Sequence, residues 1–159
     1  MLDGGEDPME SKAPGSTTSR SWERFLAMLC AIVCLVITLR IWQVIGSQQY
    51  MWPLPGLYLV EMLSLSAAVS VAVFREARFA GAIAWTTLGA MSAFAVLAAF
   101  TIGFLYLPVI VLIAIVGGLL VRRSGLSLFI HAALFLIAAA AQSAVIFAAI
   151  RILYPGAAF

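Results

Sequence analysis

The sequence predicts an all-α protein of the polytopic membrane class: a bundle of five transmembrane helices with a disordered N-terminal tail. Three observations support this prediction. Hydrophobic residues make up 64% of the chain and charged residues 10%, whereas a soluble domain has about 45–50% and about 25%. The apolar residues gather in runs long enough to cross a bilayer. The links between these runs are alternately basic and neutral, which is typical of a protein that crosses a membrane several times.

Residues 1–21 form the predicted tail, and residues 22–159 the predicted bundle. The tail is rich in Gly, Ser, Pro and acidic residues and lacks an apolar period that could build a core, which is typical of disorder. Its acidic start and the long apolar run that follows distinguish it from a signal peptide. That run, 25–46, holds 22 residues, and a helix needs about 20 to span the hydrocarbon core. We therefore expect the first transmembrane helix there.

The second helix is predicted over 53–74. Pro53 and Pro55 suit its first turn, because the N–H that proline lacks would have no partner within the helix there. Aromatic residues gather around the turn before it, as in the belt that marks a membrane interface. These residues are Trp42, Tyr50, Trp52 and Tyr58.

The stretch 79–121 carries no charge over 43 residues. As one helix it would be about 64 Å long, roughly twice the thickness of a bilayer core. We therefore predict two helices, 79–100 and 104–121, joined by a turn near Thr101, Ile102 and Gly103. Pro108 then falls in the first turn of the fourth helix, and Tyr106 is expected at the membrane interface.

The fifth helix is predicted over 126–153. Arg151 and Tyr154 at its end can extend toward the membrane surface, and Pro155 and Gly156 end it.

The basic residues predict the orientation. They precede the first helix and lie in the links between helices two and three and between helices four and five, whereas the other two links are uncharged. Because basic loops face the cytoplasm, we expect a cytoplasmic N-terminus and an external C-terminus in a cell (plasma) membrane. The absence of Asn and the excess of Arg over Lys favour a bacterial source. The residues used are Lys12, Arg20, Arg24, Arg75, Arg78, Arg122 and Arg123; Arg151 alone departs from the pattern.

Two isolated charges lie inside the predicted spans. Arg40 and Glu61 are each roughly 9–12 Å deep, in helices that a short turn makes antiparallel neighbours, so we expect them to form a pair. The structural interpretation is a salt bridge, or an Arg40 that reaches up to lipid phosphate while Glu61 is protonated. The functional interpretation is a site where Glu61 exchanges a proton or cation. A single acid without a second relay group favours the structural interpretation. Further polar residues at similar depth complete the predicted intramembrane polar cluster: Gln43, Tyr58 and Gln142.

Three further features indicate packing more than chemistry. Cys30 and Cys34 lie four residues apart in an apolar run, a spacing untypical of zinc sites and redox dithiols, and are interpreted as small apolar residues. His131 has no second histidine to share a metal, and we expect it to hydrogen-bond a neighbour. Small residues at about four-residue spacing predict close helix contacts; these are Ser64, Ser66, Ser70, Gly89, Ala93, Ala114, Gly118 and the run 138–141.

Function is predicted partly from what the sequence lacks. It contains no HExxH, GxSxG or Walker motif, no Gly-rich dinucleotide turn, and no pair of acids placed for acid–base catalysis. We therefore expect no enzyme, no cofactor and no metal site. Net charge is only +2 and the basic residues are scattered, so nucleic acid is not an expected partner.

The first hypothesis is an accessory or structural subunit that acts by helix association, with the lipid bilayer and other membrane subunits as partners. The alternative is a small transporter or proton-coupled component that uses the Arg40/Glu61 pair, with an ion or small molecule of unknown identity as substrate.

Overall fold

The structure is a computed structural model that describes residues 16–45, 54–99, 102–124 and 127–153. In these residues the chain is entirely helical apart from its links, as the sequence predicts. The elements are α1 (Ser16–Ile45), α2 (Leu54–Phe74), α3 (Ala80–Leu97), the short 3₁₀ helix η1 (Gly103–Tyr106), α4 (Leu107–Ser124) and α5 (Leu128–Leu153).

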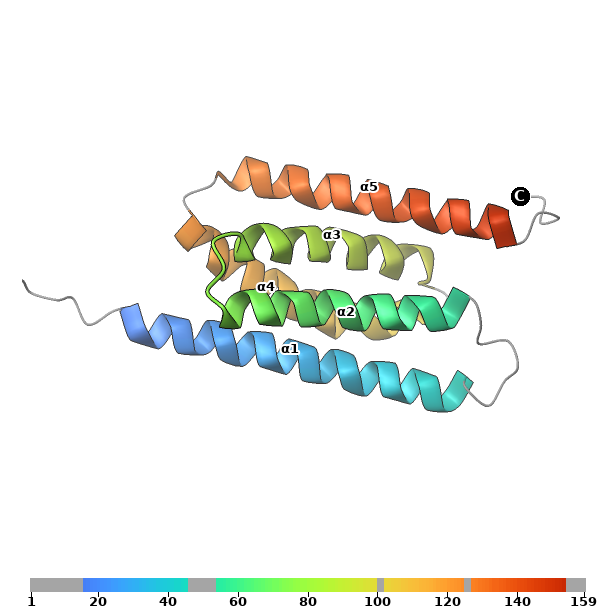
Figure 1. Cartoon of the computed structure of the whole chain (residues 1–159), viewed down its shortest axis with the longest axis horizontal. Coiled ribbons are helices and arrows are strands. Elements are labelled where there is room, and N and C mark those ends of the chain that lie inside the picture. Colours follow the sequence, from blue (N-terminus) through green and yellow to red (C-terminus); the bar gives the residue numbers. More distant parts are fainter. Residues whose placement is uncertain (1–15, 46–53, 100–101, 125–126, 154–159) are drawn as a thin grey trace, which may run out of the picture.

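All five α-helices of the described chain are long and apolar enough to cross a membrane. This confirms the predicted class, an all-α membrane protein with five spans. Successive helices run in opposite directions, so that the starts of α1, α3 and α5 lie at the same end of the bundle as the ends of α2 and α4 (Figure 1). The arginines of the α2–α3 link and of the last turn of α4 lie at this end, which we call the basic end.

Four of the helices close a ring, and the fifth lies outside it. Within the described chain, α1 packs on α2 and α4, and α3 packs on the same two helices from the other side. α5 packs mainly on α3 and forms one edge of the molecule, with α1 at the opposite edge (Figure 1). α5 is also the least buried helix, because only His131, Gln142 and Ile146 are shielded on it.

α1 begins at Ser16, earlier than the predicted start at residue 25. Its polar first turns remain helical next to the rest of the bundle, because Arg20 and Arg24 pair with Glu76 and Glu23 pairs with Arg123. The last six residues of the predicted tail therefore belong to α1, and residues 1–15 lie outside the described part. Tyr50, Trp52 and the helix end beyond residue 153 also lie outside it.

The neutral stretch forms a helical hairpin, as predicted. α3 ends at Leu97, η1 follows from Gly103, and Pro108 is the second residue of α4, in its first turn. Thr101 lies outside the described residues.

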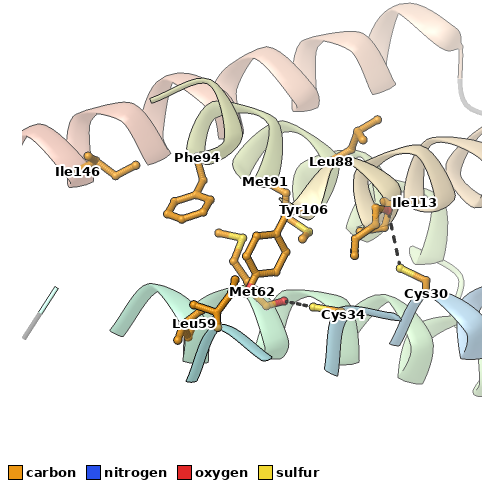
Figure 2. Packing of buried hydrophobic residues seen from close by; sticks show 12 residues of the cluster. Cys30, Cys34, Leu59, Met62, Leu88, Met91, Phe94, Tyr106, Ile113 and Ile146 are labelled. Atoms are coloured by element: carbon orange, nitrogen blue, oxygen red, sulfur yellow. Dashed lines mark hydrogen bonds between the residues drawn. The ribbon is translucent and has the colours of Figure 1, made fainter. Parts of the chain in front are cut away.

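The interface position expected for Tyr106 is wrong. Its side chain is 0% exposed, and Figure 2 shows its ring at the centre of the core, among Met62, Met91 and Phe94. η1 turns the chain at this point, so that Tyr106 points back between the helices. The hydroxyl group is then satisfied by a hydrogen bond to Thr38, at 3.0 Å, which makes burial of the phenol possible.

α3 and α5 approach each other most closely at Gly89. A Cβ atom added to Gly89 would lie 2.2 Å from the carbonyl oxygen of Phe135, so no residue with a side chain fits without a shift of the backbone. Because lipid is as apolar as a leucine side chain, membrane helices associate through close packing of this kind. The predicted packing role of Gly89 is thereby confirmed.

Candidate functional site

The α1–α2 interface is built from small polar and sulfur-bearing side chains. Cys30 Sγ lies 3.6 Å from the Ser66 hydroxyl, and Cys34 Sγ lies 3.6 Å from the carbonyl oxygen of Met62. Both cysteines are free and buried, which confirms their interpretation as small core residues. The residues of α1 that face inward recur every three or four positions; they are Glu23, Ala27, Cys30, Cys34, Thr38 and Ile41.

This register does not bring Arg40 and Glu61 together. Cys34 lies opposite Met62, so Glu61 is level with Leu35, about 7.5 Å along the axis from Arg40. Each charge also precedes a buried residue, Ile41 or Met62, and is thereby turned about 100° from the centre of the interface. In the described part of the chain, Arg40 and Glu61 form no ion pair.

The two charges lie on different sides of the α1–α2 pair. Arg40 is exposed and lines a groove of about 360 Å³ between α1 and η1, beside Ile102 and Leu105. Glu61 is half-buried and lies one turn after Tyr58, whose ring contacts Phe94 of α3 at 5.3 Å between centroids. Within the described residues the expected pair is absent because the register and the rotation of α1 and α2 carry the two charges apart.

The other members of the predicted polar cluster also separate. Gln43 is exposed on the outer surface of α1. Tyr58 and Gln142 instead point inward, and the Tyr58 hydroxyl and the Gln142 Nε2 atom are both buried without a hydrogen-bond partner in the structure. Tyr58 lines a groove of about 240 Å³ with Ile146, and Gln142 lies one turn before Ile146 on α5. Tyr58 thus faces α3 and α5, Gln142 points inward from α5, and Glu61 lies one turn after Tyr58 on α2.

His131 lies at the start of α5 and is completely buried. Its Nδ1 atom lies 3.1 Å from the carbonyl oxygen of Ser127, which confirms the expected hydrogen bond to a neighbour. Its ring lies 6.0 Å from that of Trp85, and both His131 Nε2 and Trp85 Nε1 are buried without a hydrogen-bond partner in the described part of the chain. No group of three potential metal ligands occurs among the residues that the structure describes.

Sequence reasoning missed several polar contacts, among them Thr38–Tyr106 in the core and Glu23–Arg123 at the basic end. The three- and four-residue recurrence from Glu23 to Ile41 was the available signal for the second, because it puts Glu23 on the buried face of α1. The same recurrence puts Thr38 on the buried face of α1, but it does not indicate that its partner is Tyr106, which lies 68 residues further along the sequence.

These observations define the class of the protein: an α-helical membrane protein with five candidate spans, a close-packed interior and one half-buried acid within the spans. Comparisons with protein families, with curated proteins and with solved structures found no match to this chain.

Proposed function

We propose that this protein is a non-enzymatic accessory or structural subunit that associates, through α5, with a transmembrane helix of another membrane protein. The observation that carries the proposal is the outer surface of α5. Its exposed residues Ala140, Ala144 and Ala148 recur at four-residue spacing and form a stripe of small side chains along α5. Such a stripe lets a second helix approach closely.

The place of α5 in the fold supports this proposal. α5 packs mainly on α3 and buries three residues, so most of its surface is free to contact a partner. The outer surface of α1, by comparison, carries the large side chains Ile32, Leu35, Val36 and Leu39, which fit fluid lipid but keep a neighbouring helix at a distance.

The test places a photoreactive residue at position 140 and crosslinks the protein in its native membrane. We expect an adduct with another protein in the unmodified background, and we expect Ala144→Leu to reduce the adduct by about tenfold or more, because a bulky side chain blocks the close approach. Ala67→Leu on α2 is the matched control. Ala67 is also exposed, but its neighbours at four-residue spacing are Leu63 and Val71, so this variant should leave the adduct unchanged.

Two results contradict the proposal. The first is a monodisperse protein that gives no adduct, and the second is an adduct that both variants reduce equally. An adduct of twice the mass of the chain would identify a second copy as the occupant and would replace the accessory role with self-association.

A second candidate function is favoured by the polar atoms that face α3 and α5. In this candidate, Glu61 exchanges a proton, and its path is lined by the Tyr58 hydroxyl and the Gln142 Nε2 atom, which are buried and lack a hydrogen-bond partner among the described residues. Arg40 is not part of this path.

Glu61→Gln is expected to abolish proton flux into vesicles that contain the purified protein, measured with an enclosed pH-sensitive dye. Thermal stability in detergent should stay nearly unchanged, because Glu61 forms no ion pair in the described chain. Ser64→Ala is the control, since the hydroxyl bonds only to its own helix, at Val60 O. Equal flux in the unmodified protein and in Glu61→Gln would exclude this candidate.

A further inference from the structure

The basic end of the bundle contains a pocket of about 360 Å³ where α1, the α2–α3 link and the end of α4 meet. We call it the basic pocket. Its polar lining comes from segments far apart in the sequence, which converge only in the folded chain. The charged residues that line it are Arg20, Glu23, Arg24, Glu76, Arg78 and Arg123.

The lining carries an excess of positive charge. Four arginines stand against two glutamates, which leaves a net charge of +2 on the described lining. Arg78 forms no ion pair with any described residue; its guanidinium carbon lies 5.9 Å from the centroid of the Phe79 ring. An anion that enters the pocket therefore meets cations that the two glutamates only partly neutralise.

The two glutamates hold three of the arginines in place. Glu76 accepts hydrogen bonds from Arg20, at 3.3 Å, and from Arg24, at 2.6 Å. Glu23 is almost fully buried and accepts a bond of 2.5 Å from Arg123. Because guanidinium groups held in this way lose little freedom when they bind, they are prepared for a planar or tetrahedral oxyanion.

The backbone at Glu76 supports the same arrangement. Glu76 has a φ of 51°, in the left-handed region that residues other than glycine seldom adopt. The turn between α2 and α3 places Glu76 in the lining of the pocket, where its carboxylate bonds to Arg20 and Arg24 of α1.

The pocket lies at the end of the bundle where four candidate spans begin or end. The candidate spans of α1 and α3 begin at Arg20 and Ala80, and those of α2 and α4 end at Phe74 and Arg123. The arginines are therefore at the boundary between the apolar spans and water, where the phosphates of a bilayer lie. Val73 and Leu120 add apolar surface beneath the charges, as a ligand with a polar head and an apolar body requires.

We propose that the basic pocket binds the phosphate group of an anionic ligand. Arginine donates paired hydrogen bonds to phosphate oxygens, and basic pockets between transmembrane helices suit anionic headgroups. The phosphate can come from an anionic phospholipid of the surrounding leaflet or from a soluble phosphate, and the two sources are separated by experiment.

The experiment measures binding to the purified full-length chain in detergent by native mass spectrometry and by thermal shift. The probes are dioctanoyl-phosphatidylglycerol, dioctanoyl-phosphatidylcholine and inorganic phosphate. We expect the double variant Arg24→Gln with Arg78→Gln to weaken phosphatidylglycerol binding by about tenfold or more, because charge-assisted hydrogen bonds to phosphate are lost.

The matched control is the double variant Arg75→Gln with Arg122→Gln. It removes the same charge from the same end of the bundle, but neither residue lines the pocket, and it should bind as the unmodified protein does. The single variant Arg78→Gln keeps the test valid if the pocket double variant fails to fold, since Arg78 forms no ion pair with a described residue. It should still weaken binding without lowering the melting temperature.

The outcomes separate the alternatives. Binding of phosphatidylglycerol that exceeds that of inorganic phosphate identifies a lipid site, whereas equal protection by inorganic phosphate identifies a site for soluble phosphate. Equal weakening by the pocket and control variants would overturn the proposal, because it would mean that diffuse surface charge attracts the anion. The absence of binding by all three probes would also overturn it.

Discussion

Gly89→Ala is expected to lower the free energy of unfolding by about 2–3 kcal/mol, at the upper end of the cost of overpacking a well-packed site. The new Cβ atom would lie 2.2 Å from the Phe135 carbonyl oxygen, 3.0 Å from its carbonyl carbon and 3.1 Å from its Cα atom. All three are backbone atoms, so a change of rotamer cannot relieve the clash. α5 must move away from α3, and the contact that holds it is weakened along its length.

The measurement is reversible unfolding in mixtures of dodecyl sulfate and dodecyl maltoside. Gly118→Ala on α4 is the matched control, because an added Cβ atom there meets nothing within 4 Å. That variant should be neutral or stabilising by up to about 1 kcal/mol, since alanine favours a helix over glycine. Equal stability losses in the two variants would show that α3 and α5 do not meet at Gly89.

Arg123→Leu is expected to lower the free energy of unfolding by about 2–3 kcal/mol. Removal of one partner of a fully buried ion pair costs about 3–5 kcal/mol, and the smaller value applies because the Arg123 side chain is 41% exposed. The Glu23 side chain is only 4% exposed, so it would keep its charge in a shielded place without the guanidinium group that now bonds to it.

Two further variants make this result specific, in the same unfolding assay. Arg122→Leu removes the neighbouring exposed charge and should change stability by no more than about 0.5 kcal/mol. The double variant Glu23→Leu with Arg123→Leu should recover most of the loss, because apolar residues can replace an ion pair at little cost. If Glu23→Leu with Arg123→Leu is as unstable as the two single changes combined, the Glu23–Arg123 pair does not contribute to stability.

Sequence reasoning succeeded where local properties decide. The lengths of the spans, the hairpin in the neutral stretch and the first-turn position of Pro108 follow from hydropathy, from the rise of a helix and from the chemistry of proline. His131 also met expectation, because its partner, the carbonyl oxygen of Ser127, lies only one turn away.

The contacts of the intramembrane polar cluster could not be predicted from the sequence. Counting residues places Arg40 and Glu61 inside their spans, but whether they meet depends on the register between the two helices and on the rotation of each helix about its axis. In a helix of a soluble protein, a stripe of apolar residues indicates which face of the helix packs on the core. These helices are apolar nearly all around, so their hydropathy predicted neither the direction in which the two charges face nor the register that sets Glu61 about 7.5 Å along the axis from Arg40. The position predicted for the Tyr106 side chain was wrong for a similar reason. Its burial depends on the turn at η1 and on the hydrogen bond to Thr38, which is distant in sequence.

The sequence by itself determined that lipid surrounds this chain and how many times the described helices can cross it, because both follow from runs of apolar residues and from their lengths. Only the tertiary structure decided which helices are neighbours, that α5 lies at the edge on α3, and that the arginines of three segments meet in one pocket. These features depend on packing between residues far apart in sequence. Several arrangements of the helices would bury equally apolar surfaces, and contacts such as the close approach at Gly89 and the buried carboxylate of Glu23 select one of them.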